Sequence, residues 1–197
     1  MQLLVATKNE GKLAEIKHLI NDLPLEILSL KAFPQVPEVV ENGDTFYANA
    51  EKKAVYYADK FHLWTLADDS GLEVDILEGK PGVHSARFAG GYGNDAANIE
   101  KLLRMLEDIP AEKRNARFTA VISLVSPDAK EKFFSTGHCY GVIVNKPQGN
   151  NGFGYDPVFY LPELKKTMAE LPLEVKNLIS HRAQAILNIK PILTQLC

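Results

Sequence analysis

The chain has 197 residues, enough for one domain with a substantial hydrophobic core. Its 46% hydrophobic and 24% charged residues are typical of a globular protein, and a net charge of -3 argues against a general binder of nucleic acid. Cys139 and Cys197 show neither CxxC nor Cys/His spacing, so neither a disulfide scaffold nor a zinc site is expected. A reducing compartment fits this cysteine usage.

The first third of the chain predicts a β-α-β start. Apolar runs predict strands at 2–6 and 25–30, with a helix at about 11–20 between them. The segment 31–44 holds two prolines and an Asn-Gly pair, which predicts a loop, and helical spacing of apolar residues predicts a helix at 46–61. The start of the chain does not resemble a signal peptide and no apolar run reaches membrane-spanning length, so we expect a cytoplasmic protein without a membrane partner.

The middle of the chain contains the stretch TLADDSGLEVD at 65–75. It predicts a buried strand at 63–67 and a partner strand at 72–77, separated by Asp68, Asp69, Ser70 and Gly71. Two adjacent carboxylates are costly to desolvate together. Either a cation binds there, or the two aspartates cap a turn; the residues alone favour neither.

The second half adds strands and two helices. The glycine-rich segment 78–95 predicts irregular structure, and a helix follows it. The turn sequence SPDAKE predicts a hairpin between strands at 117–125 and 131–144. After a glycine-rich loop at 148–157, Ser180 is expected to cap a last helix that Pro191 kinks or interrupts. Together these elements predict one α/β domain over 1–197, built on a mixed β-sheet flanked by helices.

Five segments carry candidate chemistry. In ATKNEGK, at 6–12, a helix N-terminus with lysines would bind phosphate, although an ordinary N-cap with solvated lysines is the commoner outcome. Asp68 and Asp69, with Glu41, are hard oxygen ligands of the kind that magnesium prefers. In GFGYDP, at 152–157, Phe153 would stack on a base, or else belong to a tight loop with a core Phe and Tyr.

The fourth segment is SHRAQA, with Lys176 just before it. His181 and Arg182 would contact a polar ring edge and a phosphate, whereas a solvated helix end is the commoner outcome for such a pair. The segment at 81–90 adds His84 and Arg87, which would line a cleft or lie in a surface loop. Phosphate-binding, metal-binding and base-stacking features together predict a magnesium–nucleotide site.

At this point the sequence resembles a known family, the non-canonical purine nucleoside triphosphate pyrophosphatases (inosine/xanthosine triphosphate pyrophosphatases, Ham1-like), over essentially its whole length. The matching motifs occur in the family's order: TKNEGK, ENGDTF, ADDSGLEVD, GKPGVHSARFAG, GFGYDP and SHR. The resemblance implies a fold of two lobes around a central active-site cleft and a homodimer. It also implies hydrolysis of ITP, dITP and XTP to the monophosphate and pyrophosphate, with Mg²⁺.

The resemblance also implies the roles of individual residues. Asp69 matches the proton acceptor and a metal ligand, and Glu41 matches a second metal-linked carboxylate. The triphosphate-binding motif comprises Thr7, Lys8, Asn9, Glu10, Gly11 and Lys12, to which Lys53 is added. The other substrate-contacting positions are Ser70, Phe153, Gly154, Tyr155, Asp156, Lys176, His181 and Arg182.

One position departs from the family pattern. The family usually reads TFxENA where this chain reads TFYANA, so Ala48 replaces an expected glutamate. Asn49 and Lys53 of that motif remain, one helical turn apart. The missing carboxylate leaves open how many metal ions bind.

Two alternatives remain at this stage, one of them from another class. A non-catalytic purine nucleotide sensor would use the same pocket, and the intact Asp68-Asp69-Ser70 stretch argues against it. A pyrophosphatase for modified pyrimidine nucleotides would have a similar architecture, and the complete SHR and GFGYDP motifs favour purines instead.

Overall fold

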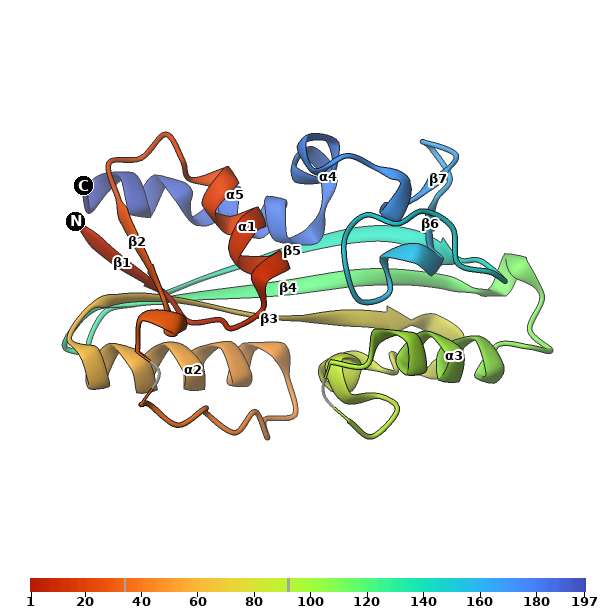
Figure 1. The fold of residues 1–197 in the computed structure, drawn as a ribbon, viewed down its shortest axis with the longest axis horizontal. Coiled ribbons are helices and arrows are strands. Elements are labelled where there is room, and N and C mark those ends of the chain that lie inside the picture. The colour runs from red at the N-terminus through yellow and green to blue at the C-terminus, as the bar shows by residue number, and fades with distance from the viewer. Residues whose placement is uncertain (34, 92) are drawn as a thin grey trace. The chain divides into compact units, whose positions relative to one another are not determined.

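The computed structural model describes residues 1–33, 35–91 and 93–197. Pro34, in the predicted loop 31–44, and Tyr92, in the predicted irregular segment 78–95, lie outside the described residues. Within the described ranges, seven strands form one sheet in the order β2-β1-β3-β4-β5-β6-β7, accompanied by five α-helices (Figure 1). The α/β prediction with a mixed sheet flanked by helices is therefore confirmed. Among the described residues, no helix is long and apolar enough to span a membrane.

The helices and strands have the following bounds. The strands are β1 Gln2–Val5, β2 Glu26–Ser29, β3 Trp64–Val74, β4 Asn115–Val125, β5 Lys132–Ile143, β6 Phe159–Leu161 and β7 Lys166–Thr167. The α-helices are α1 Glu10–Leu19, α2 Phe46–Phe61, α3 Asp95–Met105, α4 Leu173–Ile179 and α5 His181–Gln195. Short 3-10 helices occupy Leu30–Ala32, Asp75–Leu77, Gly82–Arg87, Ala111–Lys113, Asp156–Val158 and Met168–Glu170.

The chain divides into two compact units, each made of separate segments. Unit 1 comprises Met1–Asp69, Ala120–Gly137 and His181–Cys197. Unit 2 comprises Ser70–Thr119 and His138–Ser180. One domain over 1–197 and a central cleft both stay predictions.

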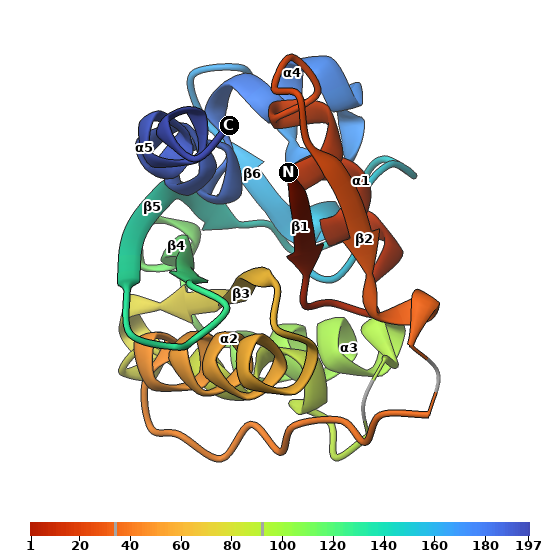
Figure 2. The same ribbon diagram turned by 90° about the vertical axis from the view of Figure 1, so that its left-hand side faces the viewer.

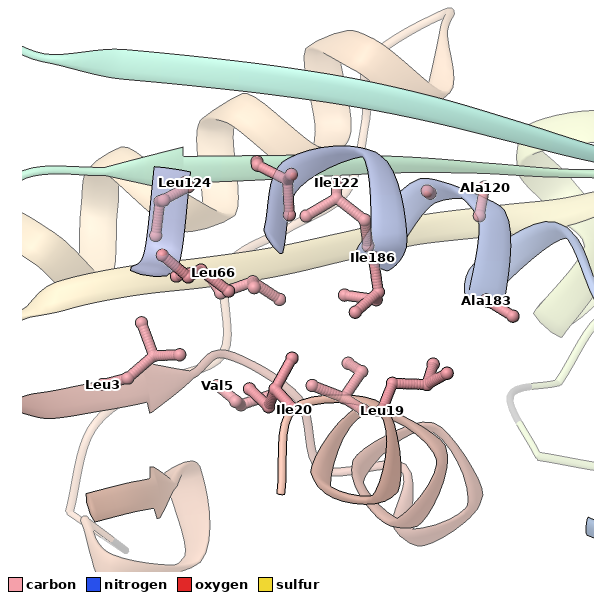
Figure 3. Close-up of a cluster of buried hydrophobic side chains, with 14 of the residues drawn as sticks. Leu3, Val5, Leu19, Ile20, Leu66, Ala120, Ile122, Leu124, Ala183 and Ile186 are labelled. Carbon is pink, nitrogen blue, oxygen red and sulfur yellow. The ribbon is translucent and has the colours of Figure 1, made fainter. Parts of the chain in front are cut away.

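Unit 1 is a layered α/β structure. Strand β1 pairs in parallel with β2 and with β3, as expected for a β-α-β start. Helices α1 and α5 cover one face of its strands and α2 covers the other (Figures 1 and 2). Leu66 on β3 and Ile122 on β4 pack against Ile186 of α5. Figure 3 shows Leu19, the last residue of α1, and Ile20 just after it in the same cluster. On the opposite face, Ala54 and Tyr57 of α2 pack against Leu4 and Ala67.

Unit 2 has a core of its own. Leu72 and Val74 of β3 pack with Ile99 and Leu102 of α3 and with Phe159 of β6. Strands β6 and β7 form a short antiparallel extension beyond β5. The sequence analysis missed β6, β7 and α4, because each is shorter than the span over which an apolar period becomes visible.

Most predicted elements are confirmed to within two residues, and helix α2 has the predicted bounds. The hairpin is confirmed as well: the turn between β4 and β5 closes with Ala129 N–H donating to the Ser126 carbonyl at 2.9 Å. The final helix continues through Pro191 to Gln195, so the predicted interruption is wrong, and a kink at Pro191 stays a prediction.

The prediction at 63–77 needs correction. Two strands with an Asp-rich turn were expected, but β3 is one continuous strand of 11 residues, followed by a short 3-10 helix. Asp68 and Asp69 therefore lie in the middle of a strand, and they cap no turn. Burial of both is possible because Asp68 contacts Lys12 and Arg182, and Asp69 lies 3.8 Å from the ammonium of Lys53.

Candidate active site

The carboxyl end of β1 leads into the ATKNEGK segment beside the middle of β3. Val5 pairs with Leu66, and Ala6 N–H donates to the Leu66 carbonyl at 2.8 Å. In open α/β sheets, ligands bind at the carboxyl ends of parallel strands. In this chain, residues 7–12, Asp68 and Asp69 lie at the carboxyl end of β1 or next to it on β3.

The first turn of α1 is capped from within the ATKNEGK segment. The Asn9 side chain accepts from Lys12 N–H at 3.0 Å, and Thr7 Oγ1 accepts from Asn9 N–H at 3.1 Å. Lys8 is exposed and pairs with Glu38 at 2.6 Å. Lys12 is not a solvated lysine, because its ammonium forms an ion pair with the buried Asp68.

Asp68 lies on the face of β3 that α1 and α5 cover. Neighbouring residues of a strand point to opposite faces, and Asp68 shares its face with Leu66 of the cluster in Figure 3. Arg182 Nε donates to Asp68 Oδ2 at 3.0 Å, in addition to the Lys12 contact. Burial by itself would raise the pKa of Asp68, but Arg182 and Lys12 outweigh it and hold this pKa far below its usual range. Asp68 is therefore ionised at neutral pH and pairs with two cations.

Arg182 is not at a solvated helix end. The residue is 1% exposed, and its guanidinium also donates to Glu15 of α1. Its position depends on how closely α5 approaches β5: a Cβ at Gly137 would lie 2.1 Å from the His181 carbonyl oxygen, so only glycine fits there. Ser135 Oγ donates to the Ala185 carbonyl at 2.7 Å and fixes the same helix. The neighbouring His181 is buried too.

Glu15 is a residue that the sequence analysis missed. It is 2% exposed, on the face of α1 that carries Lys12, Ile16 and Leu19. The available signal was an acidic residue at helical spacing within an apolar stripe, which is costly unless a cation pairs with it.

Asp69 lies on the opposite face of β3, which α2 covers. Lys53 of α2 places its ammonium 3.8 Å from Asp69 Oδ1 and 2.7 Å from Glu41 Oε1, and it donates to the Asp68 carbonyl at 2.7 Å. Burial raises the pKa of Asp69, and the opposing effects of Lys53 and Lys12 do not cancel it. The pKa of Lys53 is also raised, since the attraction of Asp69, Glu41 and Asp68 exceeds the effect of its burial.

The loop that carries Glu41 is held by α2. The buried Asn49 accepts from Gly43 N–H at 2.8 Å and donates to the Gly43 carbonyl at 3.3 Å. Gly43 has no room for a side chain, because a Cβ would lie 2.9 Å from both Ala48 Cβ and Asn49 Oδ1. Asn49 and Lys53 act from one buried face of α2, as their spacing predicted, whereas Ala48 is exposed.

The surroundings of Asp69 fit a hard divalent cation. Its Oδ2 atom is buried, and no hydrogen-bond partner for it exists among the described residues. Residues 1–33, 35–91 and 93–197 contain no ready-made group of three His, Cys, Asp or Glu ligands. Magnesium usually takes only one or two carboxylates and completes its shell with phosphates and water. Asp69 and Glu41, which both lie close to the Lys53 ammonium, would supply these one or two carboxylates.

The GFGYDP loop belongs to unit 2. Asp156 Oδ2 accepts from Phe153 N–H at 3.0 Å and from the Lys176 ammonium at 2.5 Å. That ammonium also lies 4.7 Å from the centre of the Phe153 ring, a cation–π contact. Gly152 is required here, since its φ is +76° and a Cβ would lie 2.0 Å from Asp156 Oδ2.

Tyr155 is a core residue, as expected if GFGYDP forms a tight loop with a core Tyr. It is 4% exposed, and its hydroxyl donates to the Ser85 carbonyl at 2.9 Å, which anchors the loop inside unit 2. Burial and the charge of Asp95 raise the pKa of this hydroxyl. Phe153, in contrast, is only half-buried.

The predicted site residues thus form two groups. Unit 1 brings Lys12, Lys53 and Glu41 together around Asp68 and Asp69. Unit 2 brings Phe153, Asp156 and Lys176 together. Ser70 lies on β3 at the start of the unit 2 segment, and His84 and Arg87 lie in a 3-10 helix, where His84 is exposed.

Known proteins resemble this chain over nearly its full length. It is 51% identical over 189 residues to a protein of Shouchella clausii named dITP/XTP pyrophosphatase, covering 96% of this chain and 94% of that protein. It is 52% identical over 189 residues, with the same coverage, to a protein of Geobacter sulfurreducens with the same name.

Solved structures and a family profile agree with this likeness. A HAM1 protein from Coxiella burnetii superposes with a TM-score of 0.89 at 40% identity, over 99% of each chain. The Ham1 protein of Staphylococcus aureus superposes with a TM-score of 0.87 at 40% identity, over the whole of both chains. The profile of the Ham1 family matches residues 3–192. This chain therefore belongs to the Ham1 family.

Proposed function

We propose that this protein hydrolyses non-canonical purine nucleoside triphosphates (ITP, dITP and XTP) to the monophosphate and pyrophosphate, and so clears them from the nucleotide pool. Two observations support the proposal. Relatives that are about half identical over almost the whole chain are named dITP/XTP pyrophosphatases. The observation that carries the mechanism is Asp69, a buried carboxylate with a raised pKa and one oxygen that has no hydrogen-bond partner among the described residues, which suits a general base that is also a cation ligand.

Unit 1 would bind the triphosphate. Thr7 to Lys12 form the capped start of α1, where the positive end of the helix dipole and the Lys12 ammonium suit phosphate oxygens. The Lys53 ammonium lies beside Asp69 and would hold charge that develops on the leaving pyrophosphate. Asp68 keeps Lys12 and Arg182 in place, because it is ionised and contacts both.

Asp69 would accept the proton of the attacking water. We propose attack at the α-phosphorus with pyrophosphate as leaving group, the usual in-line geometry of phosphoryl chemistry. Mg²⁺, held by Asp69 and Glu41, would supply positive charge that offsets the charge of the phosphates. The protein's part is to keep Asp69 in a water-poor setting with Oδ2 available, where its raised pKa makes it a stronger base than an exposed aspartate.

Unit 2 would bind the base. Phe153 offers a ring that Lys176 and Asp156 hold in place. Gly154 and Tyr155 shape the loop, and Ser70, His181 and Arg182 are the remaining proposed substrate contacts. A homodimer and a cytoplasmic location are further expectations, the first of which sedimentation in solution would test.

Release of pyrophosphate from a panel of nucleotides tests the proposal. The panel is ITP, dITP, XTP, GTP and ATP, each with and without Mg²⁺. We expect ITP, dITP and XTP to be cleaved, with metal required. Binding of ITP without release of pyrophosphate would contradict the proposal and favour a nucleotide sensor.

The same panel tests base selection. Hypoxanthine and xanthine carry a 6-oxo acceptor and an N1–H donor, whereas adenine carries a 6-amino donor and a bare N1. A site that donates to O6 leaves a donor facing a donor when ATP binds, and such sites discriminate by up to about 10⁴-fold. We expect kcat/KM for ITP, dITP and XTP to exceed that for ATP by a large factor, with GTP also poor. Similar values for ITP and ATP would contradict this selection.

A further inference from the structure

The ring of Phe153 is held through the backbone on both sides of its Cα. Its own N–H donates to Asp156 Oδ2 at 3.0 Å, and the N–H of the following residue, Gly154, donates to Asp95 Oδ2 at 2.7 Å. Asp156 is anchored by the buried Lys176 within the same group of residues. Asp95 is different, because it comes from α3, 59 positions away in the sequence, and none of the family motifs contains it.

The backbone of Gly154 has more conformational freedom than that of any other residue type, and its hydrogen bond to Asp95 restricts this freedom. Its φ is +61°, a left-handed conformation, yet apart from its two chain neighbours no atom of the described residues lies within 4 Å of the place where a Cβ would be. Glycine is therefore needed there for its conformation and not for lack of space, and glycine has many other conformations available. On the preceding side, Asn151 ties the loop to the Leu171 carbonyl at 3.1 Å. The hydrogen bond from Gly154 to Asp95 fixes the loop on the other side of Phe153.

Helix α3, which carries Asp95, is itself held by hydrogen bonds and by packing in unit 2. The buried Asn98 accepts from Ala89 N–H at 2.7 Å, and Lys101 donates to the Phe88 carbonyl at 2.6 Å, so α3 is tied to the segment 82–91. Ile99 and Leu102 bury the same helix in the core of unit 2. Asp95 lies in the first turn of α3, so its hydrogen bond to Gly154 fixes the loop relative to a well-packed helix.

We propose that Asp95 is a positioning residue for base binding: its hydrogen bond to Gly154 N–H keeps the Phe153 ring in the orientation that receives the purine. The proposal deepens the proposed function and rests on it for the identity of the ligand. Asp95 contacts neither the phosphates nor the reacting atoms in this scheme. Its loss therefore weakens binding of the base and leaves the chemical step unchanged.

The comparison of Asp95→Ala with Asp95→Asn separates this role from a purely structural one. Asparagine keeps an oxygen that accepts from Gly154 N–H but removes the negative charge that favours a helix N-terminus. We expect Asp95→Ala to raise KM for ITP about fivefold, the scale of one lost hydrogen bond, with kcat within about twofold of wild type. Asp95→Asn should restore KM to near the wild-type value. The control is Glu100→Ala, which removes an exposed acid from the same helix and should leave KM unchanged.

Two further measurements complete the test. The dissociation constant for IMP, measured by calorimetry, should rise in Asp95→Ala by the same factor as KM. In a Phe153→Ala background, Asp95→Ala should have almost no further effect on KM, because both changes act through one ring. Equal KM values for Asp95→Ala and wild type, failure of Asp95→Asn to restore binding, or additive effects with Phe153→Ala would each overturn the proposal.

Hydrogen exchange keeps this test independent of the proposed activity. The amide of Gly154 should exchange faster in Asp95→Ala than in wild type and at the wild-type rate in Asp95→Asn. If wild type cleaves no ITP, the proposed function fails, and the exchange rates still report whether Asp95 holds the loop. Unchanged exchange in Asp95→Ala would overturn the positioning role whatever the substrate is.

Discussion

The two faces of strand β3 shift the pKa values of two neighbouring aspartates in opposite directions. On the face covered by α1 and α5, Asp68 contacts Arg182 and Lys12, and its pKa is held far below the usual range. On the face covered by α2, Asp69 has Lys53 at 3.8 Å, an Oδ2 without a hydrogen-bond partner in the described part of the chain, and a raised pKa. The first arrangement stabilises the fold, and the second leaves a carboxylate that is costly to bury and available for chemistry. Adjacent residues of one type have thus acquired separate roles from their surroundings.

The largest expected effect is on stability, from Asp68→Ala. The change leaves Arg182 buried with Glu15 as its remaining described acidic partner, and Lys12 loses its ion pair. Removing one partner of a buried ion pair usually costs about 3–5 kcal/mol. We expect a loss of this size in the free energy of unfolding, measured with urea, together with loss of activity. A change below about 1 kcal/mol would show that Asp68 does not stabilise the α1/α5 face.

Acid titration provides a control for the same residue. Because the pKa of Asp68 is lower in the folded than in the unfolded chain, its stabilising effect is present above the unfolded value of about 3.9 and is lost as the pH falls towards the folded value. Stability of the wild type should therefore fall more steeply below about pH 4 than that of Asp68→Ala. Parallel curves would contradict the pKa assignment.

Asp69→Asn should lower activity without lowering stability, whereas Asp68→Ala should lower stability most. The change removes the proposed base and a charged cation ligand, so we expect kcat to fall about 100-fold or more, equivalent to about 2.7 kcal/mol in the barrier. A raised folded pKa means that ionised Asp69 destabilises the native state at neutral pH. The melting temperature should therefore stay the same or rise. Activity within a few-fold of wild type would remove Asp69 from its catalytic role.

Glu15→Gln measures a smaller contribution on the stabilising face. Glutamine keeps an oxygen that accepts from Arg182, while Asp68 still balances the guanidinium charge. We expect a loss of about 1 kcal/mol in unfolding free energy, well below that of Asp68→Ala. A matched control is Glu51→Gln, which removes the acid of a more exposed pair with Lys132 and should change stability less. Equal losses for the two variants would contradict the importance of burial at Glu15.

The smallest expected effect concerns Ala48, at the start of the helix that serves the Asp69 face. A glutamate at this exposed position would add the carboxylate that the family usually has. If that carboxylate supports the cation, Ala48→Glu should lower the Mg²⁺ concentration for half-maximal rate a few-fold. Ala48→Gln is the control, because it has a similar size without the charge. An unchanged requirement would show that the Asp69 face needs no further carboxylate.

The sequence by itself determined much of the local structure. Helix α2 follows from Thr45 as an N-cap and from the apolar stripe of Phe46, Ala50, Ala54 and Tyr57, and both signals are local. The start of α1 at Asn9 and the hairpin turn between β4 and β5 are determined in the same way. The order of six short motifs was enough to predict the family, which the comparisons confirm.

Only the tertiary structure decided what happens around Asp68 and Asp69. Local rules placed a turn there because two carboxylates do not belong in a buried strand. The strand continues because Arg182, 114 positions away, and Lys12 pair with one aspartate, while Lys53 lies near the other. The link from Asp95 to Gly154, across 59 positions, was equally invisible. Hydrogen bonds and ion pairs between distant segments leave no period in the sequence, since their energies depend on distance and burial that exist only once the chain has folded.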